Sequence, residues 1–319
     1  MGLALHNYHG AHNTFVSLRQ GTGGSKYTGN NNSLSGFVLL LPFIEQQALY
    51  AQWTSTYTSP TTGRVYPPWG PEMSRCQTYT NDYGPTKSQP PTILCPSDSA
   101  GYPKTSGGCG GPLGDTNYVF CFGDSSMNQD NCYQNASFRG IFGAQTFVTI
   151  AQIIDGTSNT IAMSECVVGK NTWNERSIHG GHTWGGIPSI ETAPFAGVCL
   201  NLKQGSMIGP GSPNAYGMRG NHYAAGWAVF TAFNTVLPPN SITCVLTAAT
   251  YCRNSLLPPD SYHPGGVNGL LADGSVRFIS ETIDTGNLTT VSPYVTTGQS
   301  PFGVWGALGS RACGEPKSP

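Results

Sequence analysis

Charged residues are scarce in this chain: Asp, Glu, Lys and Arg make up 10% of its 319 residues, whereas about 25% is usual for a globular domain. The 15 basic and 16 acidic residues leave a net charge of −1. Proteins that bind nucleic acid through its phosphates need a basic surface to do so. The composition therefore excludes nucleic acid as an electrostatic partner.

Closely spaced cysteine pairs are also missing, because no two cysteines are separated by only two residues. Zinc fingers, zinc ribbons and thioredoxin-like sites need such pairs, so the spacing disfavours all three. An even number of cysteines and few charges instead predict disulfides and an oxidising compartment, outside the cell or at the surface of a bacterium. The local candidates for pairing are Cys244 with Cys252, and two of Cys109, Cys121 and Cys132 with each other. The ten candidates are Cys76, Cys95, Cys109, Cys121, Cys132, Cys166, Cys199, Cys244, Cys252 and Cys313.

The sequence has no long apolar run either: the longest, Phe37 to Leu41, ends at Pro42 and falls short of the roughly 18 residues of a membrane-spanning helix. Its first residues nevertheless form an amphipathic stripe with a helical spacing, made by Met1, Leu5, Tyr8 and His12. The stripe opens without a capping residue, so we expect residues 1–15 to be the end of a longer helix.

The rest of the chain predicts one domain over residues 1–319 that is rich in loops and strands. A second helix is expected from Pro42, with Leu41, Ile44 and Ala48 on its buried face. Residues 54–115 are dense in Pro, Gly, Ser and Thr and predict a loop-rich insertion. Apolar or alternating runs predict strands over 117–120, 140–143, 160–168, 227–233 and 244–252.

The clearest local signal is a β-hairpin within residues 260–280. Two apolar runs, GLLA and SVRFI, are joined by Asp273-Gly274. This dipeptide favours a two-residue type I′ turn, in which both residues have positive φ.

No familiar catalytic motif occurs in the sequence, and we therefore expect a protein that is not an enzyme. The chain lacks a Gly-x-Ser-x-Gly elbow, a phosphate-binding glycine loop with Lys-Ser/Thr, and a His-Glu-x-x-His helix. The fragments GDSS (123–126) and VLTAATYC (245–252) are similar to serine-protease elements, but Thr250 stands in the place of the catalytic histidine. The two fragments also occur in the wrong order for that fold.

Two turn motifs carry residues that a catalytic site would use, and we favour structural roles for both. His263 lies ten positions before Asp273-Gly274; it precedes the first strand of the hairpin while Asp273 is at the tip, so a His–Asp dyad is disfavoured. In the other motif, we expect Ser158 and Asn159 to bond the backbone of the Asp155-Gly156 turn. The alternative is a hydrolase in which His179, His182, His263 or Asp273 converge.

Three groups of residues are candidate metal ligands, although we expect no resident cofactor. His179 and His182 could bind a metal together with Glu175 or Glu191, the alternative being a polar surface loop. Asp124 and Asp130, with Asn131, could bind Ca²⁺ through oxygen ligands. On one helix, His6, His9 and His12 would fan over about 120°, so two of them could share a metal.

Five segments in order along the chain resemble a family abundant in planctomycete bacteria, domain of unknown function 1559. HPGGVNGLLADGSVRFI resembles its C-terminal His-x9-Asp-Gly signature, and DGTSNTIAMSE (155–165) its Asp-Gly-x-Ser-Asn-Thr motif. ILCPSD (93–98) resembles its central Cys-Pro element. GLALHNYH (2–9) and LLLPFIEQQALY (39–50) resemble the end of its N-terminal segment and its second helix.

The resemblance implies a prepilin-type protein, anchored in the membrane or packed in a filament core by a hydrophobic helix upstream of Met1. The expected fold is α+β and pilin-like, with a truncated N-terminal helix packed on an antiparallel β-sheet and long disulfide-pinned loops. The expected function is an extracytoplasmic structural subunit of a surface filament or cell-envelope assembly that associates with itself or with other pilin-like subunits. The alternative is a membrane-anchored surface module that binds a glycan or a protein, because 15 Tyr and 6 Trp among many Asn and Gly suit sugar stacking.

Overall fold

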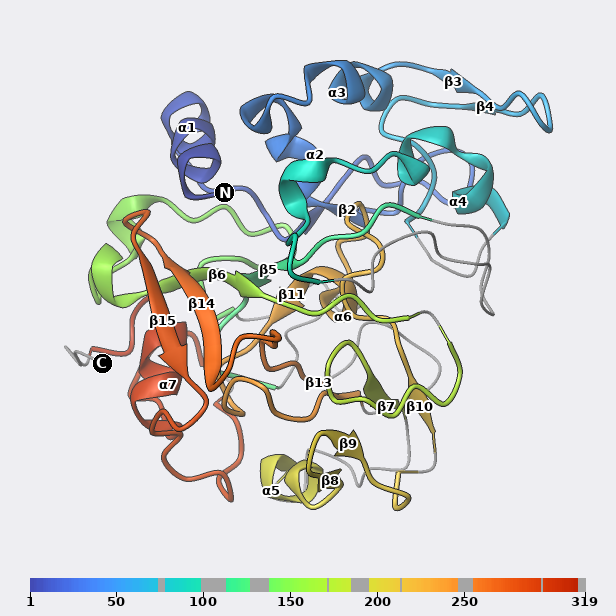
Figure 1. Cartoon of the computed structure of the whole chain (residues 1–319). Helices are drawn as coiled ribbons and strands as arrows, with labels where there is room; N and C mark the ends of the chain where they lie inside the picture. The colour runs from blue at the N-terminus through green and yellow to red at the C-terminus, as the bar shows by residue number, and fades with distance from the viewer. Residues whose placement is uncertain are drawn as a thin grey trace.

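The computed structural model describes residues 1–73, 78–98, 113–126, 138–170, 172–184, 195–212, 214–245, 255–293 and 295–314. They form short helices and several small β-sheets, which confirms the predicted α+β class (Figure 1). The α-helices are α1 (Gly2–His12), α2 (Gly36–Leu40), α3 (Gln47–Thr54), α4 (Thr78–Asp82), α5 (Phe195–Leu200), α6 (Ala228–Thr231) and α7 (Gly303–Gly309). The 3-10 helices are η1 (Leu41–Ile44), η2 (Gly84–Lys87), η3 (Pro91–Ile93), η5 (Ile150–Gln152) and η6 (Thr157–Asn159).

The strands are mostly short and belong to sheets of two, four and five strands. The first of them are β1 (Arg19–Gln20), β2 (Leu34–Ser35), β3 (Tyr57–Thr58), β4 (Val65–Tyr66), β5 (Tyr118–Cys121), β6 (Ile161–Glu165), β7 (His182–Trp184) and β8 (Lys203–Gln204). The others are β9 (Met207–Ile208), β10 (Ala215–Tyr216), β11 (Ala232–Phe233), β12 (Cys244–Val245), β13 (Ser255–Leu256), β14 (Gly266–Leu271) and β15 (Val276–Ser280).

The largest sheet has the strand order β11-β5-β6-β14-β15. Neighbours from β5 to β15 are antiparallel, as predicted, but β11 pairs with β5 in parallel. The sheet is therefore mixed rather than purely antiparallel. A parallel neighbour needs a long connection, and here more than a hundred residues separate β5 from β11.

Helices cover both faces of this sheet, with α1, α2 and α3 above it and α7 below its β14–β15 end (Figure 1). On the upper face Phe37 of α2 packs on Phe120 of β5, with ring centroids 4.4 Å apart. On the lower face the fully buried Trp305 of α7 lies in a cluster with Val119 and Cys121. Alternate residues of β5 thus serve two cores, which explains its continuous apolar sequence.

Helix α1 buries Leu5 and Tyr8 of the predicted stripe, together with Ala4, whereas Met1 is half-buried and His12 is exposed, so the stripe is confirmed in part. It packs mainly on η1, where the ring of Tyr8 contacts Phe43 at 5.7 Å between centroids. Its first turn reaches the sheet, where a Cβ placed on Gly2 would lie 2.9 Å from Leu270 Cδ1. Helix α1 therefore contacts the sheet through its first turn, while Phe37 of α2 packs on β5. Within the described ranges, no helix has both the length and the apolar character needed to cross a membrane.

The predicted second helix is divided into three parts. The apolar run itself forms α2, capped by Ser35, whose hydroxyl accepts a hydrogen bond from the amide of Phe37. Pro42 lies at the start of the 3-10 helix η1, as a residue without an N–H can. Glu45 then takes φ 61° and breaks the helix before α3, so that Ala48 is exposed rather than buried.

The predicted hairpin is present as β14 and β15, but its turn differs from the predicted one. Gly274 has φ 88°, whereas Asp273 does not have positive φ. The amide of Gly274 donates a hydrogen bond to the carbonyl of Leu271, and the amide of Leu271 donates one to the carbonyl of Ser275. The loop therefore has three residues ending in a left-handed glycine, a common hairpin type that requires positive φ at one residue only.

Other strand predictions are confirmed in part. Strands β5 and β6 fall within 117–120 and 160–168, apart from the last residue of β5. Residues 140–143 form a bend and a bridge, so the strand predicted there is wrong. Residues 227–233 form α6 followed by the two-residue strand β11, so the prediction of a strand there is right only at its end. A short buried apolar run fits either structure, and periodicity cannot distinguish them. Residues 246–254, which include most of the strand predicted over 244–252, lie outside the described residues.

The predicted disulfide framework is largely corrected within the described residues. Cys244 on β12 pairs with Cys199 on α5, with Cα atoms 6.3 Å apart, and not with Cys252. Cys121 remains a thiol, so neither predicted pair that includes it forms. The cysteines that remain thiols are Cys95, Cys121, Cys166 and Cys313. Three of them are buried, where a thiol packs as a small apolar group. Cys76, Cys109, Cys132 and Cys252 lie outside the described residues.

Candidate functional site

One pocket, which we call the acidic pocket, brings together three segments that are far apart in the sequence. It has a volume of about 290 Å³ and lies between residues 95–98, 165–167 and 260–263. The first segment belongs to ILCPSD and the second begins at the last residue of DGTSNTIAMSE. The third ends at His263, the first residue of the His-x9-Asp-Gly motif. Three of the motifs identified in the sequence therefore meet at a single hollow.

The buried side chain of Asn117 connects two of these segments. Its Oδ1 accepts a hydrogen bond from the amide of Cys95 at 2.8 Å. Its Nδ2 donates to Asp98 Oδ2 at 2.6 Å and to the carbonyl of Cys166 at 2.9 Å. The amide of Cys166 donates in turn to the carbonyl of Asn117. Asn117 thus fixes the position of the Cys-Pro element against the end of β6.

Three carboxylates line the pocket, those of Asp98, Glu165 and Asp260. Each accepts at least one hydrogen bond from a backbone amide, which holds it in place. The amide of Val168 donates to Asp98 at 2.9 Å and that of Gly180 to Asp260 at 2.9 Å. The amide of Asn268 donates to Glu165 at 2.8 Å. Among the lining residues that the structure describes there is no lysine or arginine, and the described lining is therefore acidic.

Two histidines approach these carboxylates. His263 Nε2 lies 3.5 Å from Glu165 Oε1, and the His263 side chain is 40% exposed. His179 Nδ1 lies 3.8 Å from Asp260 Oδ2. The His179 ring also packs against Tyr262, with centroids 5.3 Å apart. His263 lines the acidic pocket, whereas His179 lines the hollow beside it.

Tyr262 lines both the acidic pocket and a second hollow. The second hollow has a volume of about 320 Å³ and shares Ser261, Tyr262 and His263 with the first. Tyr262 is 52% exposed. Partial burial, followed by the negative charges of Asp98 and Asp260, raises the pKa of its phenol. Tyr262 therefore stays protonated at neutral pH and offers a hydroxyl and a ring face to solvent.

Two thiols also line the pocket. Burial raises the pKa of the Cys166 thiol, which keeps it in the weakly nucleophilic protonated form. Its Sγ lies 3.5 Å from the carbonyl of Thr116. Cys95 is partly exposed. The arrangement is suited to binding, since its carboxylates accept hydrogen bonds and its buried thiol is not activated.

The two histidines predicted as metal ligands lie in different surroundings. His182 is buried on β7 against Tyr216, whereas His179 lines the second hollow. In the part of the chain that the structure describes, no three His, Cys, Asp or Glu side chains are placed to hold a metal ion. Glu191, Asp130 and Asn131 lie outside that part.

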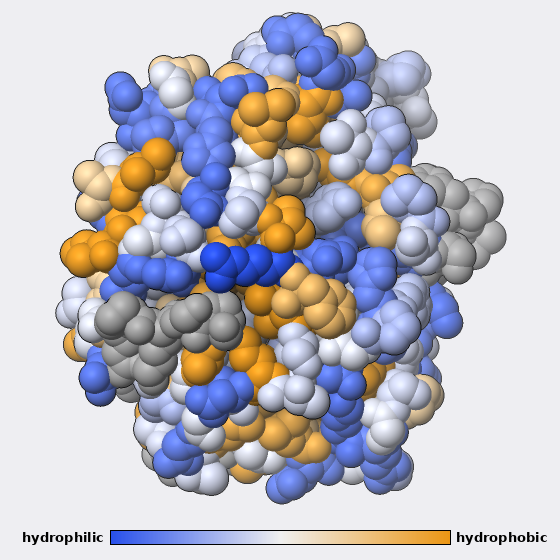
Figure 2. Space-filling view, turned by 60° about the vertical axis from the view of Figure 1, so that its left-hand side comes forward, coloured by the Kyte–Doolittle hydropathy of each residue, from blue (hydrophilic) through white to orange (hydrophobic). Residues whose placement is uncertain are grey.

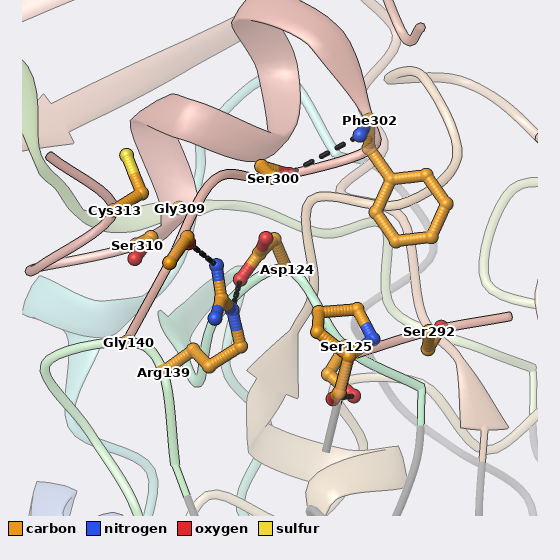
Figure 3. Close-up of polar contacts among 12 residues, drawn as sticks. Asp124, Ser125, Arg139, Gly140, Ser292, Ser300, Phe302, Gly309, Ser310 and Cys313 are labelled. Carbon is orange, nitrogen blue, oxygen red and sulfur yellow. Dashed lines mark hydrogen bonds and ion pairs between the residues drawn. The ribbon is translucent and has the colours of Figure 1, made fainter. Parts of the chain in front are cut away.

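Asp124, a candidate calcium ligand, is instead fully buried and paired with Arg139. Arg139 Nε lies 2.5 Å from Asp124 Oδ1, and the two side chains point toward each other (Figure 3). The other guanidinium nitrogens donate to the carbonyls of Val295, Thr297 and Gly298. This pair was not predictable, because nothing in the local sequence pattern marks Arg139 as buried.

The three histidines of α1 contact aromatic rings. His6 and His9 both lie against Phe15, with ring centroids 6.3 and 5.1 Å apart. His12 packs on Tyr8 at 4.3 Å. His9 Nε2 accepts a hydrogen bond from the amide of Ile150. Burial, and then the nearby His6, lower the pKa of His9.

The Asp155-Gly156 turn ties the C-terminal segment to the fold. Asp155 accepts hydrogen bonds from the amides of Cys313 and Gly314, at 2.6 and 2.9 Å. Asn159 Nδ2 donates to the carbonyl of Asp155, and Gly156 takes φ 92°. Ser158 is exposed on η6.

The hairpin tip packs beside the same turn. Asp273 accepts hydrogen bonds from the amide and the hydroxyl of Ser275, at 2.8 and 2.6 Å. Its own amide donates to the carbonyl of Thr157. Asp273 is thus at the tip, where its carboxylate contacts Ser275, while His263 contacts Glu165 at the acidic pocket. These contacts do not form a His–Asp dyad.

Exposed apolar side chains lie at the start of α1 and on β15. Leu3, Val276 and Phe278 are 76%, 64% and 54% exposed. With Met1 they form what we call the N-terminal strip. Met1 and Val276 border a groove of about 320 Å³ that also reaches Glu165 of the acidic pocket. Figure 2, turned toward the side of α1 and the β14–β15 hairpin, shows hydrophobic side chains in several exposed patches.

The fold and these motifs define an α+β protein with short helices and small sheets. A family model described as "Protein of unknown function (DUF1559)" matches residues 1–286. The chain belongs to this family, which confirms the resemblance found in the sequence. No curated protein and no solved structure matches the chain.

Proposed function

We propose that the protein is an extracytoplasmic, pilin-like structural subunit of a surface filament or cell-envelope assembly. The observation that supports this is the N-terminal strip, formed by Met1, Leu3, Val276 and Phe278. Contiguous exposed apolar patches commonly mark interaction surfaces, and here Met1 and Val276 line one groove. Their position at the start of a helix and on the last strand of a sheet suits contact with a copy of the same chain.

The proposal has three further parts that follow from the family resemblance. A hydrophobic helix upstream of Met1 would continue α1 and anchor the protein in a membrane or pack in the filament core. The site of action would be the surface of a bacterium. The role would be structural rather than enzymatic, with no resident cofactor.

Self-association through the strip is testable with charged substitutions. We expect the sedimentation coefficient of the wild-type chain to rise with protein concentration. Leu3→Asp and Phe278→Asp should each abolish this rise, because a buried unpaired carboxylate strongly opposes association. Val65→Asp is the matched control, since Val65 is 59% exposed on β4, and it should associate as the wild type does.

Either of two results would count against the proposal. One is a wild-type chain that remains monomeric at all concentrations. The other is unchanged association of both strip variants, which would move the interface elsewhere.

A second candidate is a membrane-anchored surface module that binds a glycan or protein ligand. The acidic pocket favours it, because it is concave, carries an exposed tyrosine and presents several hydrogen-bond acceptors. The two candidates are compatible, since the pocket and the N-terminal strip share no residue.

A further inference from the structure

We infer that two copies of the chain associate edge to edge through β15, with the two β15 strands paired antiparallel so that the five-stranded sheets of both copies become one. This inference rests on the proposed self-association and names the contact through which it occurs. It adds backbone hydrogen bonds to the exposed apolar side chains of the N-terminal strip.

The position of β15 leaves one long side of this strand uncovered. Among the described strands β14 is its only neighbour, and β15 lies at the outside of the sheet (Figure 1). At the other end of the sheet, Ala232 and Phe233 of β11 are fully buried. Val276 and Phe278 of β15 are instead 64% and 54% exposed. Of the two edges, β15 is therefore the one that a further strand can reach.

Hydrogen bonds at the two ends of β15 show which of its backbone groups point outward. The carbonyl of Ser275 and the amide of Glu281 both bond toward the chain of β14. In an antiparallel pair, such residues alternate with residues whose amide and carbonyl point away from the partner strand. Val276, Phe278 and Ser280 therefore direct these groups outward. Apart from the pairing with β14, no hydrogen bond to the amide or carbonyl of Val276 or Phe278 is found in the described part of the chain.

This row of outward donors and acceptors favours an extended backbone as its occupant. A strand offers the same alternation of amides and carbonyls, and it can add to a sheet edge by bonding them. A lipid surface or a helix could cover the apolar side chains but would leave these backbone groups without partners. Edge strands that avoid such pairing commonly carry a proline, a bulge or a lysine. β15 has none of the three: it reads VRFIS, and its register with β14 is regular.

The outward residues of β15 suit a second copy of the same strand. With Phe278 opposite Phe278 of the second copy, Val276 lies opposite Ser280 of that copy, and the exposed apolar side chains of both copies become neighbours on one face. The outward amide and carbonyl of Phe278 then exchange two hydrogen bonds with those of its counterpart. Such an interface uses the same surface on both copies and closes as a dimer, so a filament would need a further contact.

Charge and packing select this register over its neighbours. Arg277 lies on the other face of β15, opposite Ile279 of the second copy and diagonal to Glu281 of that copy, a distance that a long side chain can span. A shift of two residues in one direction would place the two Arg277 side chains directly opposite each other, which is unfavourable for like charges. A shift of two residues in the other direction would separate the two Phe278 rings.

Disulfide trapping in the whole chain tests the register. Residues that form a hydrogen-bonded antiparallel pair have Cα atoms about 5.5 Å apart, a distance that a disulfide spans. Val276→Cys chains mixed with Ser280→Cys chains should therefore give a cross-linked dimer when diamide is added, at concentrations where the wild type associates. Peptide mapping should recover the fragments of residues 276 and 280 joined together.

Each cysteine variant alone is the matched control for the mixture. In the proposed register, the two introduced cysteines of either variant alone would lie four residues apart along the paired strands, or roughly 13 Å. Each variant alone should therefore give at least about tenfold less cross-linked dimer than the mixture, because a disulfide cannot span that distance.

A proline substitution tests the backbone hydrogen bonds. Val276→Pro removes an outward amide, and an edge strand tolerates proline where the amide faces solvent. The sedimentation coefficient of this variant should not rise with concentration, while its urea midpoint should stay near that of the wild type. Lys26→Pro is the matched control and should associate as the wild type does. Lys26 is exposed in a turn closed by the amide of Thr28 and the carbonyl of Ser25, at a position that favours proline.

Two outcomes would overturn the inference and leave the proposed self-association standing with its contact elsewhere. One is a wild-type chain that associates while the mixture gives no 276–280 cross-link. The other is a folded Val276→Pro chain that associates as the wild type does. If Val276→Pro does not fold, the cross-link alone decides. A wild-type chain that stays monomeric at all concentrations would contradict the proposed self-association and this inference together.

Discussion

Arg139→Met should lower the free energy of unfolding by about 3–5 kcal/mol, since it leaves the buried carboxylate of Asp124 without its cation. The two side chains are 1% and 0% exposed and 2.5 Å apart (Figure 3). The substitution also removes the donors to the carbonyls of Val295, Thr297 and Gly298. Urea unfolding measures the change.

Two controls make this prediction specific. Arg64→Met removes an exposed arginine that lies over the ring of Tyr27, and it should have a much smaller effect. The double variant Asp124→Leu/Arg139→Met should be less destabilised than Arg139→Met alone, because it removes both charges together. A single variant as stable as the wild type would show that the pair is not buried in solution.

Removing the disulfide between α5 and β12 should have the next largest effect. The Cys199–Cys244 bond closes a loop with a sequence separation of 45 residues. Restricting a loop of this size in the unfolded chain stabilises a protein by about 2–4 kcal/mol. Cys199→Ala/Cys244→Ala should lose about this much stability in urea unfolding without reductant.

The matched control is Cys95→Ala, which replaces a partly exposed thiol and should cost far less. Peptide mapping without reductant should recover the fragments of Cys199 and Cys244 joined together. Finding Cys244 joined to Cys252 would contradict the structure and restore the pairing that sequence proximity suggests.

The sequence predicts local features of this fold better than long-range ones. The β14–β15 hairpin was predictable because Asp273-Gly274 stands between two apolar runs. The type of its turn was not predictable, because a loop with positive φ at Gly274 alone closes the hairpin as well as a turn with two such residues. Residues 228–231 form a helix where a strand was expected, because an apolar run buried on all sides carries no periodicity.

The cysteines and the acidic pocket depend on contacts that no local pattern reveals. Cys121 and Cys166 remain thiols and lie in one buried cluster. Cys199 pairs with Cys244, from which several helices and strands separate it in the sequence. Glu165 and His263 belong to motifs that were recognised separately. The antiparallel pairing of β6 with β14 and the hydrogen bond from the amide of Asp260 to the carbonyl of Glu165 bring their segments together.

Electron microscopy of the protein purified from its native source, under non-denaturing conditions, tests most directly whether it is a subunit of an assembly. Our account predicts ordered filaments or regular oligomers, and a mass spectrum of the same material would show whether a hydrophobic segment precedes Met1. Uniform monomers at every concentration would contradict the structural role. The acidic pocket would then remain as the site of a surface binding protein.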